Sequence, residues 1–152
     1  MPSKEGYEIP PQQVPTNDAG YLGMMTKAIF QAGFRWQVIR DKWPNFQRAF
    51  DNFDVETVAR YDDRDVERLL GDAGIVRNGR KIEATIHNAH VMRDLISEHG
   101  SFSAFLRSLD GKDYRERRKT LNRLFKNLGP TSIFVFLWTV GEKVPPWEER
   151  AS

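Results

Sequence analysis

Apolar residues recur every three or four positions along most of the chain, and this spacing is typical of amphipathic α-helices. The first stretch follows the capping residue Asn17 and stops at Gly33, which predicts a helix over residues 18–32. Its apolar positions are Leu22, Met25, Ile29 and Phe30. A second, short helix is predicted to begin at Pro44 and to stop near Asn52, because proline is favoured in the first helical turn.

Six more helices are predicted from capping residues and from the glycines that stop them. Two short helices follow Asp54 and Asp62, and a long one runs from Asn78 to His99. The last three are expected over residues 102–109, 114–126 and 131–140. Since no segment alternates like a β-strand, the sequence predicts an all-α fold, a compact bundle of about eight short helices.

The two ends of the chain differ in composition. Residues 1–16 contain four prolines among polar residues, which predicts a Pro-rich tail ahead of a single helical domain over 17–152. The longest apolar run, 133–138, is far shorter than the roughly 20 residues that span a bilayer, and the amino terminus lacks the apolar stretch of a signal peptide. We therefore expect a cytoplasmic protein without membrane contact.

Composition excludes several kinds of chemistry. The chain has no cysteine, so disulfides, thiolate metal sites, iron–sulfur clusters and a cysteine nucleophile are excluded. His87, His90 and His99 lie on one predicted helix without enough further ligands, so we expect neither a metal nor a cofactor. The chain also lacks the G-x-S-x-G, G-x-x-x-x-G-K and G-x-G-x-x-G motifs, which disfavours hydrolases of the serine type, P-loop enzymes and Rossmann dehydrogenases.

Charge is concentrated in one segment. The net charge is only +2, but residues 112–126 carry seven basic against two acidic side chains, a local charge of +5. Such a run is commonly the solvated face of a helix. Here the basic run leads into a glycine turn followed by an apolar helix. That arrangement can present backbone N–H groups to phosphate. The alternative is a plain helix–helix turn without a ligand. The candidate DNA-binding residues are Arg123, Lys126, Asn127, Gly129 and Thr131.

Aromatic residues surround the glycine that ends the first helix. Phe30, Phe34 and Trp36 flank Gly33, and most aromatic side chains belong to the core. A tryptophan just after such a break can instead present its face at the rim of a cleft and stack on a nucleobase. We expect Trp36 to be partly exposed at a cleft, with all three aromatic residues as candidate substrate-binding groups.

Several short motifs, in the same order along the chain, resemble the 3-methyladenine DNA glycosylase I family. They are Phe30–Trp36, Asp65–Leu69, Asp72–Asn78 followed by Lys81-Ile82, and the turn Leu128–Thr131. The resemblance implies an all-α, helix-hairpin-helix glycosylase that flips an alkylated adenine out of double-stranded DNA and cleaves its N-glycosidic bond. It also implies that Trp36 stacks on the flipped base and that residues 126–131 grip the DNA backbone.

The chain differs from this family in its metal ligands, its base pocket and its candidate catalytic carboxylate. The family's zinc-binding cysteines and histidines are missing. The resemblance implies a base-recognition glutamate near Ala28, but no carboxylate occurs between Asp18 and Asp41. Its amino-terminal pocket aromatic has no clear equivalent, although Tyr7 or Tyr21 could take that place. Many relatives carry a catalytic aspartate beyond the hairpin, where the candidate carboxylates here are Glu148 and Glu149.

Three functions are consistent with these features of the sequence. The leading hypothesis is a zinc-free, monomeric DNA glycosylase of base-excision repair that is associated with the nucleoid and acts on alkylated purines. The second is a catalytically inactive helix-hairpin-helix module that only binds DNA. The third is a helical adaptor for other proteins, which is favoured if DNA binding shows no salt dependence.

Overall fold

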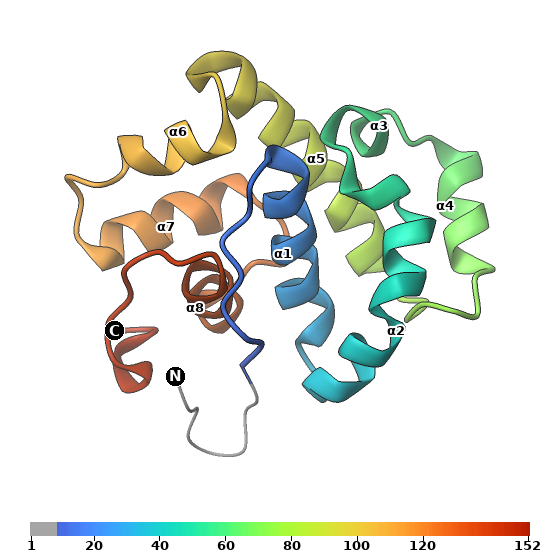
Figure 1. Cartoon of the computed structure of the whole chain (residues 1–152), viewed down its shortest axis with the longest axis horizontal. Coiled ribbons are helices and arrows are strands. Elements are labelled where there is room, and N and C mark those ends of the chain that lie inside the picture. Colours follow the sequence, from blue (N-terminus) through green and yellow to red (C-terminus); the bar gives the residue numbers. More distant parts are fainter. Residues whose placement is uncertain (1–8) are drawn as a thin grey trace.

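The chain folds into helices joined by short turns, as predicted (Figure 1). The computed structural model describes residues 9–152, and this part of the chain contains no strand. The helices are α1 (Asp18–Gln31), α2 (Trp36–Ala49), η1 (Asp51–Phe53), α3 (Val55–Ala59), α4 (Asp63–Leu70), α5 (Gly79–His99), α6 (Phe102–Ser108), α7 (Tyr114–Leu124), α8 (Pro130–Thr139) and η2 (Trp147–Glu149). None of these helices is long and apolar enough to cross a membrane.

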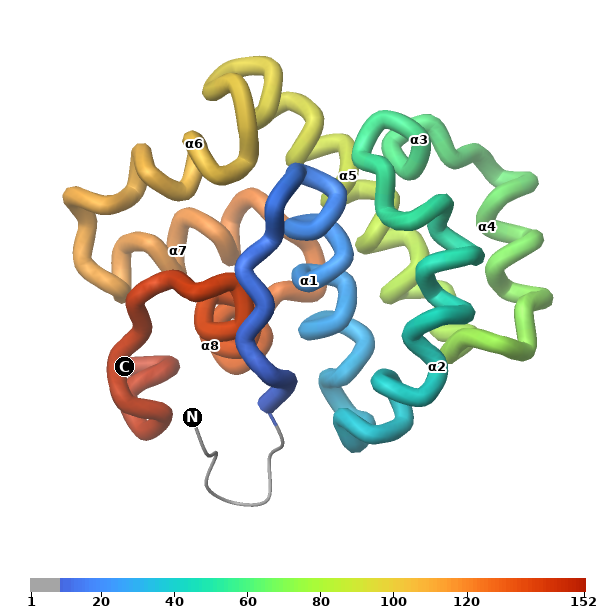
Figure 2. The backbone as a smooth tube through the Cα atoms, in the orientation of Figure 1, coloured from blue at the N-terminus to red at the C-terminus, as the bar shows by residue number. Residues whose placement is uncertain are grey.

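Helix α1 lies between two groups of helices. Figure 2 shows α2, α3 and α4 on one side of α1, and α6, α7 and α8 on the other. Helix α1 contacts both groups, and the long helix α5 contacts α1, α3, α4 and α6. Helices α1 and α8 carry apolar residues on most sides, and almost all of these residues are buried, so both helices lie inside the fold. A residue on α1 can therefore face either half of the molecule.

Most helix starts lie where the capping residues predict them. Asn17 accepts a hydrogen bond from the amide of Gly20 (2.9 Å), and Asn78 accepts one from the amide of Lys81 (3.1 Å). Asp62 forms a reciprocal capping box at the start of α4. These bonds satisfy amides that have no partner inside the helix, so the local sequence specifies the boundaries directly.

The prediction for α2 is wrong at its start. The helix begins at Trp36 rather than at Pro44, and the proline lies inside it. Proline within a helix costs about 3 kcal/mol because a hydrogen bond is lost and the ring crowds the preceding turn. Ile39 and Phe46 are fully buried on the same face as Trp36, and the burial of this apolar face outweighs that cost.

The described part of the predicted tail packs on the domain. The amide of Gln13 donates to the carbonyl of Thr139 (2.7 Å), and the side chain of Gln12 donates to the carbonyl of Trp138 (3.0 Å). Residues 9–16 therefore follow the end of α8 before α1 begins. Residues 1–8 lie outside the described part.

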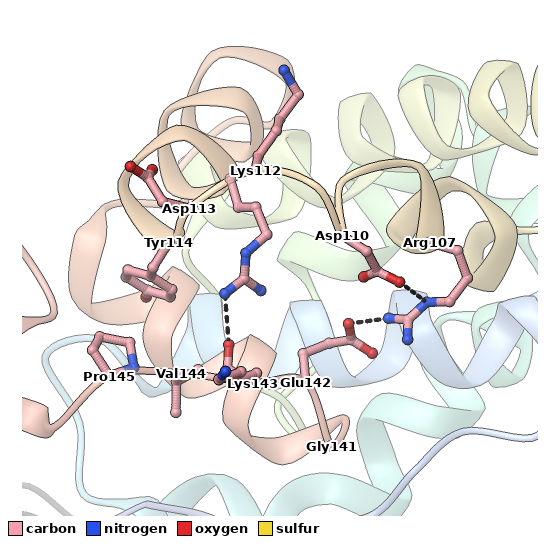
Figure 3. A pocket seen from close by; sticks show the side chains of 11 residues that line it. Arg107, Asp110, Lys112, Asp113, Tyr114, Gly141, Glu142, Lys143, Val144 and Pro145 are labelled. Atoms are coloured by element: carbon pink, nitrogen blue, oxygen red, sulfur yellow. Dashed lines mark hydrogen bonds and ion pairs between the residues drawn. The ribbon is translucent and has the colours of Figure 1, made fainter.

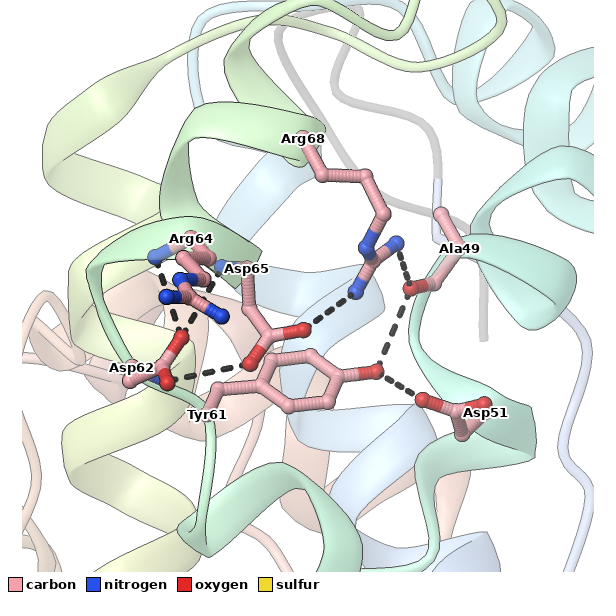
Figure 4. A network of polar contacts seen from close by, with 7 residues as sticks. All are labelled: Ala49, Asp51, Tyr61, Asp62, Arg64, Asp65 and Arg68. Carbon is pink, nitrogen blue, oxygen red and sulfur yellow. Dashed lines mark hydrogen bonds and ion pairs between the residues drawn. The ribbon is translucent and has the colours of Figure 1, made fainter.

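A polar network joins the end of α2 to α4 (Figure 4). The carbonyl of Ala49 accepts a hydrogen bond from Nη1 of Arg68 (2.8 Å) and lies 3.2 Å from the hydroxyl of Tyr61, which also donates to Asp51. Burial and the Asp51 carboxylate raise the pKa of Tyr61, so the phenol keeps its proton. The network holds the three residues of η1, which all have positive φ angles, against the end of α2.

Candidate nucleic-acid interface and aromatic cavity

Helices α7 and α8 form a hairpin whose turn is fixed from α5. Asn88 is completely buried, and its side chain bonds both backbone groups of Lys126: Oδ1 accepts from the amide (2.8 Å) and Nδ2 donates to the carbonyl (3.1 Å). Phe125 and Leu128 are buried on either side of the turn, whereas the side chains of Lys126 and Asn127 are exposed. The turn is therefore held rigidly while its polar side chains face solvent.

Helix α8 begins directly after this turn. Gly129 is its capping residue and Pro130 occupies its first position, so the next amides, of Thr131 and Ser132, have no partner earlier in the helix. Such a terminus carries partial positive charge and favours phosphate. The Thr131 hydroxyl accepts a hydrogen bond from Nε of Arg150 (3.1 Å) and keeps its own proton to donate. The hydroxyl and the first-turn amides are therefore both available to an anion.

Gly129 does not use the conformational freedom of glycine. Its φ is −80°, which any residue adopts, and a Cβ built there meets nothing within 4 Å. The residue with a left-handed conformation is Asn127 (φ 56°), a residue type that tolerates it. The open space beside Gly129 leaves room for a phosphate instead.

The basic run does not form one continuous face. Arg118 is buried and donates to the carbonyls of Arg150 and Ser152 (3.2 and 2.9 Å), and Arg117 donates to the carbonyl of Lys143 (2.9 Å). Two of the seven basic residues therefore hold the carboxy-terminal segment. Arg123 and Lys126 are exposed close to the turn and remain suited to contact DNA.

A cavity of about 620 Å³ lies at the ends of α7 and α8 that are remote from the hairpin turn, between the α6–α7 connection and the segment after α8 (Figure 3). Arg107 pairs there with Asp110 (3.6 Å) and with Glu142. Arg117 contacts a backbone carbonyl, as described above. Because these guanidinium groups already have protein partners, the cavity is less suited to bind an anion than the hairpin is.

We expect Lys126→Ala and Arg123→Ala to weaken binding to all DNA sequences alike. Each substitution removes one phosphate contact, so the slope of log K against log salt concentration should become shallower by about one unit. Fluorescence anisotropy at several salt concentrations measures this slope. Unchanged affinity in both variants would place the DNA surface elsewhere.

We expect Gly129→Val to reduce DNA affinity at least tenfold with little change in stability. The isopropyl group fits in the open space of the free protein but keeps a phosphate away from the first-turn amides of α8. Thermal unfolding and DNA titration on the same preparation separate the two effects. A large fall in melting temperature together with unchanged affinity would contradict this interpretation.

The aromatic residues near Gly33 are less exposed than predicted. Trp36 is only 9% exposed, so the expectation of a ring at an open rim is wrong. Its position at the start of α2 explains this, because the buried face of that helix faces α1. Phe30 is fully buried with its ring edge-on to Phe46 (4.8 Å), and Phe34 is 42% exposed with Nζ of Lys81 5.2 Å from its ring.

A cavity of about 300 Å³ lies between α1, α2, η1 and the segment before α1. Trp43 and Phe53 form its aromatic wall, with ring centroids 5.1 Å apart and planes 6° from parallel. Nζ of Lys27 lies 4.7 Å from the ring centroid of Trp43 and 5.4 Å from that of Trp36. Burial lowers the pKa of Lys27. Sequence reasoning missed this lysine, although it is the only charged residue between Asp18 and Arg35.

The remaining candidates lie apart from this cavity. Glu148 and Glu149 are exposed on η2, which packs near the start of α8 through the edge-on contact of Trp147 with Phe134 (5.3 Å). Tyr21 is buried against Phe102 (5.2 Å), and Tyr7 lies outside the described residues. Within residues 9–152, no group of three or more histidine, cysteine, aspartate or glutamate residues could hold a metal ion.

An all-helical fold with a rigid, basic hairpin before an open helix terminus defines a protein of the helix-hairpin-helix class. Residues 13–127 match the methyladenine glycosylase family, and the chain belongs to that family. The motifs around Gly33 and Asp65 therefore indicated the correct family.

Individual relatives agree with this assignment. The chain is 46% identical over 59 residues to DNA-3-methyladenine glycosylase 1 of Escherichia coli (strain K12), a match covering 39% of this chain and only about a third (32%) of that protein. It is 25% identical over 130 residues to the DNA-3-methyladenine glycosylase of Haemophilus influenzae, covering 73% and 70%. The structure of 3-methyladenine DNA glycosylase I from Staphylococcus aureus superimposes with a TM-score of 0.76 at 28% identity, covering 89% of this chain and 85% of that one.

Proposed function

We propose that the chain is a DNA glycosylase of base-excision repair that removes an alkylated purine by flipping it out of the helix and hydrolysing its N-glycosidic bond. The hairpin carries this proposal, because the family fold is combined here with a turn that Asn88 fixes in place. Such a turn binds the backbone of DNA without reading its sequence, as a search for damaged bases requires.

The proposed mechanism divides the work between two regions. The hairpin and the first turn of α8 hold phosphates beside the lesion, and the aromatic cavity receives the flipped base. Stacking on an aromatic ring is worth about 1–3 kcal/mol per base. Carboxylates that stabilise positive charge on the sugar and orient water are proposed on η2, at Glu148 or Glu149. The residue after η2, Arg150, contacts Thr131 at the start of α8, so these carboxylates would act on the sugar from the hairpin side, apart from the aromatic cavity.

The proposed partner is double-stranded DNA, bound by a monomer in the nucleoid of the cytoplasm. The proposal uses no metal and no cofactor, because hydrolysis of an alkylated purine nucleotide needs only binding, charge stabilisation and water. Purines whose alkylation leaves a positive charge depart more readily than normal bases, whereas neutral adducts depend more on charge stabilisation by the protein.

A second candidate is a DNA-binding module without enzymatic activity. Two observations favour it: no carboxylate occurs between Asp18 and Asp41, where the resemblance implies the family's glutamate, and the carboxylates of η2 are exposed. Chromatography of bases released from a panel of damaged duplexes separates the two. Release of a modified base supports the glycosylase, whereas tight, salt-dependent binding without release supports the module. Absence of both would leave the protein-binding adaptor.

A further inference from the structure

Lys27 lines the aromatic cavity and lies against the rings of two tryptophans, of which Trp43 lines the cavity and Trp36 lies behind it. Nζ of Lys27 is 4.7 Å from the ring centroid of Trp43 and 5.4 Å from that of Trp36. Trp36 is almost fully buried, so a base that stacks on its ring would have to lie against this ammonium group or displace it. The lysine side chain is therefore part of any base site formed by these rings.

Among residues 9–152, the ammonium group has no acidic partner. No carboxylate occurs between Asp18 and Asp41, and residues 9–152 contain no ion pair or side-chain hydrogen bond of Lys27. Burial alone lowers its pKa, without any contribution from a neighbouring charge. The faces of aromatic rings stabilise a cation only partly. The positive charge thus remains available to a ligand that enters the cavity.

The cavity has the size and the walls of a small-ligand site. Its volume of about 300 Å³ lies at the lower end of the range for such sites. Trp43 and Phe53, which stack on each other, contribute aromatic surface to its lining, and the polar side chain of Gln47 lines the same space. A planar ring with a polar edge fits this chemistry better than an aliphatic ligand.

We propose that Lys27 determines the substrate class of this glycosylase: its ammonium group selects a flipped purine that is uncharged and offers an acceptor edge, and it rejects a cationic one. This inference rests on the proposed function, whose base site it defines. It concerns alkylated bases in particular. Methylation of adenine at N3 leaves a positive charge on the nucleotide, whereas a neutral adduct such as 1,N6-ethenoadenine keeps ring-nitrogen acceptors and hypoxanthine presents a carbonyl.

In a site that is partly shielded from water, electrostatics favours a neutral base over a cationic one beside Lys27. Two unit charges a few ångströms apart repel far more strongly away from water than in it, so a cationic base is disfavoured beside Lys27. A neutral base can instead accept a hydrogen bond from Nζ, and bonds from charged donors are stronger than neutral ones. Both effects act in the same direction.

The test compares wild-type protein with Lys27→Met, which keeps the unbranched, flexible part of the side chain and removes its charge. Base release is measured from duplexes carrying 1,N6-ethenoadenine or hypoxanthine and from duplexes treated with dimethyl sulfate, which yield 3-methyladenine. We expect the ratio of kcat/KM for the cationic over the neutral substrate to rise at least tenfold in Lys27→Met. Lys42→Met, which removes a charge from a lysine of α2, should leave the ratio unchanged.

A binding assay keeps the inference testable if the protein releases no base. Tryptophan fluorescence is titrated with neutral hypoxanthine and with the permanently charged 3,9-dimethyladeninium ion. Wild-type protein should prefer the neutral ligand at least tenfold, and Lys27→Met should lose that preference. The same preference in both proteins would overturn the role of Lys27. Absence of base release from every substrate, with the binding preference intact, would instead overturn the proposed glycosylase activity.

Discussion

Replacing Trp36 by alanine is expected to lower the free energy of unfolding by about 3–5 kcal/mol, because the ring is 9% exposed and its removal leaves a cavity between α1 and α2. For a domain of this size, the melting temperature should fall by about 6–20 °C. Thermal denaturation followed by circular dichroism measures the change. A fall of less than about 2 °C would show that the ring contributes little to the core.

The conservative variant Trp36→Phe separates packing from recognition. Phenylalanine retains a ring in the interface but offers a smaller face to Lys27 and to a base. We expect most of the stability to be retained in this variant, while affinity for a damaged duplex falls several-fold, since base stacking is worth about 1–3 kcal/mol. Normal affinity in a stable Trp36→Phe protein would assign Trp36 to the core alone.

Replacing Asn88 by alanine is expected to cost about 2–6 kcal/mol of stability and to weaken DNA binding as well. The variant leaves the amide and the carbonyl of Lys126 without their buried partner, and each unsatisfied group costs about 1–3 kcal/mol. The turn that precedes Gly129 also loses its support from α5. Chemical denaturation and DNA titration at a temperature where the variant is folded measure both effects.

Asn122→Ala is the matched control on the exposed side of the same turn. Its side chain donates one hydrogen bond to the carbonyl of Leu128 (3.0 Å), and water can replace that bond. We therefore expect a loss of at most about 1 kcal/mol and nearly normal DNA affinity. Equal effects of the two substitutions would contradict the view that the turn is held from the buried side.

Helix boundaries with polar caps could be predicted from the sequence because the cap is local. Asn17, Asp62 and Asn78 bond amides two or three residues away, so a short window contains the complete cause. The start of α2 could not be predicted in this way. There, a buried face shared with α1 overrides the preference of Pro44 for a first turn, and that face depends on residues far away in the sequence.

The residues of the candidate site also divide into those with a local signal in the sequence and those whose role depends on contacts between helices. Lys126 was identified because charge clusters beside a glycine turn, both of which are visible in the sequence. Asn88 and Lys27 were missed, since their roles depend on contacts between helices. A signal existed for each of them: Asn88 is a polar residue on an apolar helix face, and Lys27 is the single charge in an otherwise uncharged stretch. Neither signal identifies the groups that Asn88 and Lys27 contact in the structure.

Single-turnover cleavage of a duplex with one modified purine tests the central claim most directly. With protein in excess, a glycosylase leaves an abasic site at the lesion, and alkali converts that site into a strand break at one position. We predict breaks only at the lesion for the wild-type protein, and at least tenfold slower formation for Lys126→Ala at moderate salt. Intact strands for every modified purine, in wild-type protein that still binds the duplex, would contradict the account.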